Sequence, residues 1–131
     1  MAKSINFLDT NCLLRYVLGD NQIQAEKVEA LIKQGVQIDT AAFLEFVWVL
    51  QSFYKMSRQQ VHDRLKIITD DKRVNCEKVL LDEVVAIYLS QKQVSFLDVY
   101  LSLVAEQKGG YLRTFDEPLS KKMAQQVQLV V

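Results

Sequence analysis

The 131-residue chain has little of what breaks or cross-links a fold. It contains one proline and four glycines, which favours regular helices and strands joined by short loops. Its only cysteines, Cys12 and Cys76, are far apart and lie in apolar surroundings. Two such thiols exclude a disulfide framework and suit a reducing cytosol. A single histidine, His62, leaves no Cys/His cluster of the kind that binds zinc.

Long hydrophobic runs and a net charge are also missing. No apolar stretch reaches the roughly 20 residues that span a bilayer, so we expect no membrane contact. The N-terminus, residues 1–4, leads directly into a predicted strand, so we expect no signal peptide. Sixteen basic and sixteen acidic residues give a formal net charge of zero. The composition therefore lacks the basic excess typical of nucleic-acid binders, although acids that hold divalent cations would still present positive charge to phosphates.

Half of the residues are apolar, which is enough to bury a core without disulfides or a structural metal. Linkers, repeats and shifts in composition are absent, so we expect one domain over residues 1–131. The apolar patterns predict strands at about 4–8, 36–39, 74–76, 111–115 and 127–130. They predict helices at about 11–19, 21–34, 41–54, 57–69, 77–91, 96–108 and 118–126. This alternation predicts an α/β fold, with a parallel sheet and helices on both faces.

Two acids follow predicted strands. Asp9 stands where the first strand ends, and no other charge lies between Lys3 and Arg15. Asp116 likewise follows the strand predicted at 111–115. Ligands of open α/β sheets gather at the carboxyl ends of the strands, so acids on neighbouring strands would point into one crevice. Asp116 also suits the cap of the next helix, and the pattern alone does not separate the two roles.

Two further acids are isolated within apolar helices. Glu45 is the only charge between Asp39 and Lys55, and Asp98 is the only charge within 93–105. Burial of an unpaired carboxylate costs several kcal/mol, which is comparable with the net stability of a domain. Each acid should therefore have a cation, a proton or a functional cleft. The alternatives are a core-edge glutamate that reaches water or pairs with an arginine, and an aspartate that caps its helix.

Four carboxylates in one cleft would repel each other and would raise their pKa values or recruit cations. Carboxylate, water and phosphate oxygens suit hard cations such as Mg²⁺ or Mn²⁺. Asn11 and Thr114 lie two residues from Asp9 and Asp116, where they can orient a carboxylate or a phosphate oxygen or serve only as turn residues. Arg15 can contact a substrate or pair with one of the acids.

Taken together, four pieces of the sequence resemble the PIN-domain ribonucleases, and among them the VapC-type toxins of type II toxin–antitoxin pairs. The pieces are FLDTN at 7–11, AAFLEFVWVL at 41–50, FLDVYLSLVAEQKG at 96–109 and TFDEPL at 114–119. The resemblance implies a three-layer α/β/α sandwich around a central parallel sheet of four to five strands. It also implies an acidic metal cleft that cleaves RNA. Position by position, it implies a quartet of acids with two polar helpers: Asp9, Glu45, Asp98 and Asp116, with Asn11 and Thr114.

The resemblance thus predicts a cytoplasmic, metal-dependent endoribonuclease. One or two Mg²⁺ or Mn²⁺ ions would bind Asp9, Asp98 and Asp116, with Glu45 bound directly or through water. The implied partners are an RNA substrate, a second copy in a homodimer, and a small antitoxin that covers the acidic cleft. The apolar helix at 12–18 is a candidate partner surface, or ordinary core. The mixed charges of 55–75 form either a basic patch or a solvated helix face.

Two other functions remain open. A catalytically silent PIN-like interaction domain would keep the acids for structure or regulation. A phosphatase or phospho-acceptor would also place an acid after its first strand. That class needs a second aspartate in the first loop or a lysine at the end of a later strand, and the sequence offers neither.

Overall fold

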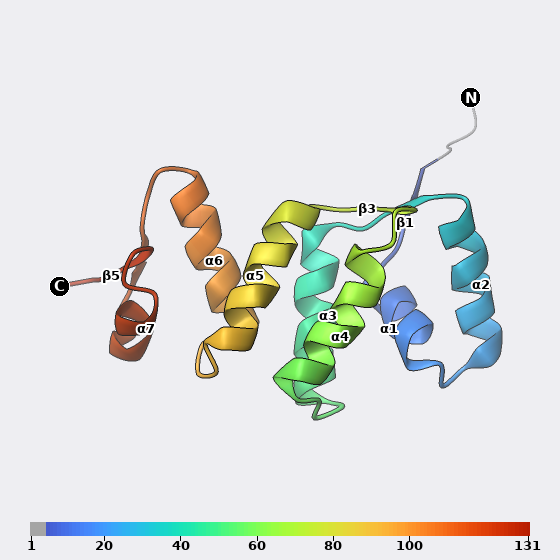
Figure 1. Ribbon diagram of the computed structural model, residues 1–131, viewed down its shortest axis with the longest axis horizontal. Helices are drawn as coiled ribbons and strands as arrows, with labels where there is room; N and C mark the ends of the chain where they lie inside the picture. The colour runs from blue at the N-terminus through green and yellow to red at the C-terminus, as the bar shows by residue number, and fades with distance from the viewer. Residues whose placement is uncertain (1–4) are drawn as a thin grey trace. The chain divides into compact units, whose positions relative to one another are not determined.

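The computed structural model describes residues 5–131, in two compact units (Figure 1). The first unit ends at Lys78 and contains β1 (Asn6–Phe7), α1 (Thr10–Leu18), α2 (Gln22–Lys33), β2 (Val36–Gln37), α3 (Thr40–Ser52), α4 (Arg58–Thr69) and β3 (Val74–Asn75). The second unit, Val79–Val131, contains α5 (Lys78–Ser90, which begins at the boundary), α6 (Phe96–Gln107), β4 (Leu112–Thr114), α7 (Glu117–Lys122) and β5 (Val127–Leu129). Two predictions lie outside the described residues. They are the absence of a signal peptide before the first strand and the start of that strand at Ser4.

All strand pairs in the described chain are parallel. In the first unit the order is β1-β2-β3, and Phe7, Gln37 and Asn75 are in register. In the second unit β4 pairs with β5. The α/β class with parallel strands is therefore confirmed, and five strands are described. The expectation of one domain stays a prediction.

The helices begin where the sequence supplies a cap. The N-caps of α1 to α4 are the side chains of Asp9, Asn21, Asp39 and Ser57, and Ser57 forms a full capping box with Gln60. These oxygens satisfy backbone N–H groups that have no partner within the helix. Gly19, at φ 66°, closes α1 in the left-handed conformation that glycine adopts without strain. Local chemistry therefore sets most helix starts close to their predicted positions.

Apolar faces of the helices form the cores. In α4 the residues Val61, Leu65 and Ile68, which recur at helical spacing, are all buried. In α5 Tyr88, and not its neighbour Leu89, is fully buried, and its ring packs edge-on against Phe96 at 5.4 Å between centroids. The last helix is shorter than predicted, since α7 ends at Lys122. Within residues 5–131 no helix is both long and apolar enough to cross a membrane.

Candidate active site

The end of β1 positions Asp9. The Leu8 amide donates to the Gln37 carbonyl at 3.1 Å, which fixes the chain beside β2. Asp9 then caps α1, and its Oδ1 accepts a hydrogen bond from the Cys12 amide at 2.9 Å. Hydrogen bonds from the Cys12 backbone and thiol hold the pKa of Asp9 below its usual value. The exposed Asp9 is therefore a carboxylate at neutral pH, with one oxygen engaged by the helix.

A hydrogen bond between helices relates Glu45 to Asp9. The buried Thr10 hydroxyl donates to the Ala42 carbonyl at 3.0 Å and joins α1 to α3. Thr10 follows Asp9 directly, and Glu45 lies three residues after Ala42 on the same helix face. Both acids therefore lie within about one helical turn of this bond.

The structure corrects the expected setting of Glu45. The sequence predicted a carboxylate among apolar residues, where it is costly unless compensated. Glu45 is instead exposed, and so are its helical neighbours Ala41 and Trp48, the latter with 65% of its surface accessible. Apolar neighbours do not bury a helix position when they share its exposed face. Glu45 thus reaches water and needs no partner for stability.

The first turn of α6 carries Asp98. Ser95 caps this helix, and its hydroxyl accepts a hydrogen bond from the Asp98 amide at 3.1 Å. The Ser102 hydroxyl donates to the Asp98 carbonyl at 2.7 Å. The alternative in which Asp98 itself caps the helix is therefore wrong. Its half-buried carboxylate is left for another role.

Asp116 follows β4, and its Oδ1 accepts a hydrogen bond from the Leu119 amide at 3.0 Å as the cap of α7. Thr114 accepts a hydrogen bond at its Oγ1 from the Asp116 amide, also at 3.0 Å. The cap role of Asp116 is thus real, and Thr114 fixes its backbone. In the second unit β4 packs against α6, so the strand that leads to Asp116 and the helix that carries Asp98 are neighbours (Figure 1).

The four predicted acids therefore fall into two pairs, one pair in each compact unit. Asp9 and Glu45 lie beside the contact of α1 with α3. In the second unit Asp98 lies on α6 and Asp116 follows β4, which packs against α6. In the described part of the chain, no group of three or more His, Cys, Asp or Glu side chains is gathered closely enough to hold a metal ion. Convergence of all four acids stays a prediction.

Two further acids that follow neighbouring strands, Asp39 and Glu77, were not predicted from the sequence as site residues. Phe7, Gln37 and Asn75 are in register, and two residues further on each strand leads to an acid: Asp9, Asp39 and Glu77. Asp39 accepts a hydrogen bond from the Ala41 amide at 3.0 Å, and Glu77 accepts one from the Thr40 hydroxyl. The repeated strand-to-acid spacing was the available signal. Both carboxylates already serve the local fold.

Comparison with known proteins places the chain. The family model described as PIN domain matches residues 7–123, a range that includes all four predicted acids. The chain belongs to the PIN domain family. This PIN domain is 27% identical, over 112 residues, to a VapC ribonuclease of Aquifex aeolicus (strain VF5). That alignment covers 80% of this chain and 82% of the relative. No solved structure gives a significant match.

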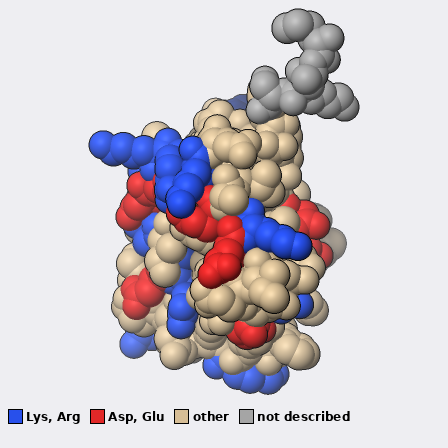
Figure 2. Space-filling view, turned by 90° about the vertical axis from the view of Figure 1, so that its right-hand side faces the viewer, with Lys and Arg blue, Asp and Glu red and all other residues tan. Residues whose placement is uncertain are grey.

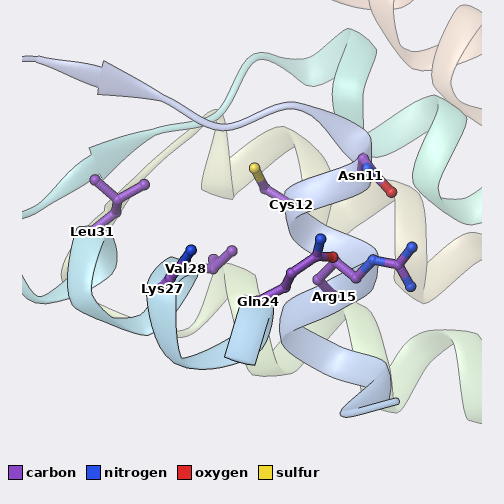
Figure 3. Close-up of a pocket in the computed structure, with 7 residues that line it drawn as sticks. All are labelled: Asn11, Cys12, Arg15, Gln24, Lys27, Val28 and Leu31. Carbon is purple, nitrogen blue, oxygen red and sulfur yellow. The ribbon is translucent and has the colours of Figure 1, made fainter. Parts of the chain in front are cut away.

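Arg15 of the PIN domain does not pair with a predicted metal ligand. Its Nη1 lies 3.3 Å from Asp20 Oδ2. Its Nε is buried and has no hydrogen-bond partner within the described residues. Asn11, one turn earlier on α1, is exposed. Figure 3 shows both side chains at one end of a groove between α1 and α2.

Charges on the PIN domain are interspersed. Figure 2 shows acidic and basic side chains side by side on the face in view. Within 55–75, Lys66 pairs with Asp70 at 2.9 Å, and Arg73 pairs with Asp71 at 2.7 Å and with Glu29 at 3.2 Å. Exposed ion pairs of this kind contribute little to stability, and the solvated helix face expected for 55–75 stays a prediction, as does the basic patch.

Proposed function

We propose that this chain is a metal-dependent endoribonuclease that hydrolyses RNA phosphodiester bonds, and that it is the toxin of a type II toxin–antitoxin pair. The observation that carries the proposal is the PIN domain match over residues 7–123, a range that contains Asp9, Glu45, Asp98 and Asp116. The VapC relative, named a ribonuclease, supports the same activity. The two units would then act as one PIN domain.

The acids suit a hard divalent cation. Asp9 and Asp116 each use Oδ1 for a helix cap, which leaves the second oxygen available as a ligand. The lowered pKa of Asp9 keeps its carboxylate ionised at neutral pH. Oxygen donors of this type prefer Mg²⁺ or Mn²⁺. In the proposal Asp9, Asp98 and Asp116 hold one or two such ions, and Glu45 contributes directly or through water.

The reaction is the addition of water to phosphorus with loss of a ribose oxygen, which yields a phosphate monoester and a hydroxyl. A bound divalent cation supplies positive charge that offsets the charge developing on the phosphate and favours ionisation of the attacking water. Glu45 is exposed and can orient that water through a hydrogen bond. Thr114 holds the Asp116 backbone, and Asn11 and Arg15 face the substrate from α1.

The proposal also includes partners. A small antitoxin would cover the acidic residues, and two copies of the chain would form a homodimer. The protein would be located in the cytoplasm. The helix at 12–18 can serve as only part of a partner surface, because Leu13 and Val17 are buried in the core. Leu14, Tyr16 and Leu18 are half-buried and remain accessible in part.

The deciding experiment is Mn²⁺-dependent cleavage of total cellular RNA by purified protein. We expect Asp9→Asn, Asp116→Asn and Glu45→Gln to abolish cleavage while the circular dichroism spectrum is unchanged. Glu83→Gln is the matched control for Glu45→Gln, since both glutamates are exposed on helices. Retained cleavage in both aspartate variants would contradict the proposal.

The same preparations separate the alternatives. A wild-type protein that leaves RNA intact with either Mg²⁺ or Mn²⁺, yet folds normally, would favour the silent interaction domain. Turnover of an aryl phosphate with RNA untouched would favour a phosphatase.

A further inference from the structure

A groove runs between α1 and α2 in the first unit (Figure 3). Its volume is about 270 Å³, and its lining is Asn11, Cys12, Arg15, Gln24, Lys27, Val28 and Leu31. In the close-up, Asn11 and Arg15 lie at one end and Leu31 at the other, with Lys27 toward the Leu31 end. Three lining residues come from α1, the helix that Asp9 caps. The groove therefore starts within one turn of a proposed metal ligand.

The lining has the chemistry of a nucleotide site. Arg15 and Lys27 are cationic, and the lining contains no carboxylate. The amides of Asn11 and Gln24 each offer a donor and an acceptor, as base edges and ribose hydroxyls require. Cys12, Val28 and Leu31 supply the apolar floor that a base can cover. Drug-sized ligand sites occupy roughly 300–1,000 Å³, so this smaller groove suits a single nucleotide.

Lys27 and, in part, Arg15 have donors left for a ligand. Lys27 is exposed, and the described residues give it no ion pair. Arg15 Nη1 donates to both carboxylate oxygens of Asp20, at 3.4 and 3.3 Å, and its buried Nε has no hydrogen-bond partner in the described chain. A buried donor without a partner is costly and gains free energy when a ligand supplies an acceptor. Phosphate oxygens are such acceptors, and arginine binds them through two parallel hydrogen bonds.

We propose that this groove is the subsite of the nuclease that holds a nucleotide of the RNA substrate next to the bond that is cut. This inference rests on the proposed function, because an RNA strand with its reacting phosphate at Asp9 must pass over the adjoining surface. Arg15 and Lys27 bind the phosphates on either side of the nucleotide, and Asn11 and Gln24 contact its base or ribose. An acidic protein segment is the competing occupant. The groove favours RNA because its cations stand apart, with the Gln24 amide and the side chains of Cys12 and Val28 between them.

The two cysteines allow a direct test. Cys12 lines the groove and Cys76 does not, and both side chains are half-buried. The 131-residue protein is treated with iodoacetamide in EDTA, which prevents cleavage, and alkylation of each cysteine is followed by peptide mass spectrometry. The probe is a short mixed-sequence single-stranded RNA, and a polyglutamate peptide forms a second arm. We expect the RNA to slow alkylation of Cys12 and not that of Cys76, and the peptide to slow neither.

A pair of lysine variants adds a second readout. Lys27→Gln and Lys33→Gln remove the same charge from exposed positions of α2, and only Lys27 lines the groove. In fluorescence anisotropy with the same RNA, Lys27→Gln should weaken binding about ten-fold, as loss of a charged hydrogen bond does. It should also reduce the slope of log affinity against log salt by about 0.7, the value for one phosphate contact on a single strand. Lys33→Gln should change neither quantity and should keep RNA protection of Cys12.

The outcomes are separate from those of the cleavage assay. RNA that fails to bind, or that binds without slowing Cys12 alkylation, overturns the subsite even when Mn²⁺-dependent cleavage is intact. Equal weakening of RNA binding by Lys27→Gln and Lys33→Gln also overturns the subsite, since the effect then comes from the loss of positive charge anywhere on α2. Protection by polyglutamate and not by RNA assigns the groove to a protein partner. Protection by RNA in a protein that cleaves nothing would keep the groove as an RNA-binding site, but it would remove both the nuclease proposal and the place of the groove beside a cut bond.

Discussion

Replacement of Asp9 by asparagine and by alanine should separate its two roles. The Oδ1 atom accepts the Cys12 amide and caps α1, whereas the charge of the carboxylate serves the proposed metal site. Asparagine caps a helix about as well as aspartate, while alanine loses about 1 kcal/mol. We therefore expect Asp9→Ala to lower the free energy of unfolding by about 1 kcal/mol, which corresponds to a melting temperature about 4 °C lower. The free energy of unfolding of Asp9→Asn should stay within about 0.5 kcal/mol of that of the wild type, because a negative charge near a helix N-terminus contributes about this much.

The pH dependence supplies an internal check. The pKa of Asp9 is lower in the folded chain than its ordinary value of 3.8, chiefly through the Cys12 amide bond. Its charge therefore adds stability above pH 3.8, and this contribution is lost as the pH falls below 3.8 through the folded pKa. The stability difference between wild type and Asp9→Asn should accordingly shrink on acidification.

Urea unfolding followed by circular dichroism, at neutral pH and near pH 3, measures these quantities. RNA cleavage with Mn²⁺ is measured on the same samples. Both variants should be inactive, and only Asp9→Ala should be clearly destabilised. If Asp9→Asn is destabilised as much as Asp9→Ala, the cap bond to Cys12 does not support α1 and the reasoning fails. If Asp9→Asn is stable and still active, Asp9 is only a cap.

Three further predictions concern the first unit. Thr10→Val should lower the unfolding free energy by about 1 kcal/mol, because it removes the hydrogen bond to Ala42 without a change of size; an unchanged urea midpoint would contradict this bond. Gly19→Ala should cost about 1 kcal/mol through its left-handed backbone alone, since nothing lies within 4 Å of the added carbon; thermal melting tests this, and a larger loss would indicate a steric clash. Leu65→Ala should cost about 2–5 kcal/mol in urea unfolding and the exposed Ile67→Ala less than 1 kcal/mol, so equal effects would place α4 in the wrong orientation.

Features set by neighbours in sequence could be predicted, and features set by packing could not. The start of α4 follows from Ser57 and Gln60, which form the capping box by themselves. The strand predicted at 36–39 is shorter in the structure, where β2 covers Val36–Gln37. The Ile38 amide still donates to the Asn75 carbonyl at 3.0 Å, and the chain then turns at Asp39, which caps α3. An apolar run marks burial, as at Ile38, but does not reveal where pairing stops.

The candidate site shows the same division. An isolated acid is visible in the sequence, and so is its place after a strand or within a helix. The exposure of Glu45 depends on which face of α3 packs inward, and its near neighbours in the sequence do not determine that face. Lys27 was missed because a lysine on an amphipathic helix is common and only the approach of α2 to α1 makes it line a groove.

The strands of the first unit are only two residues long, whereas α3 alone buries Phe43, Phe46, Val47 and Leu50. The parallel sheet thus aligns the ends of the strands that lead to Asp9, Asp39 and Glu77, but the packing of the helices holds these strands in place. Amide hydrogen exchange should reflect this division. The amides of α3 should exchange most slowly, through global opening, and those of β1 to β3 should exchange earlier, through local fraying. The backbone that presents Asp9 would then loosen before the unit itself unfolds.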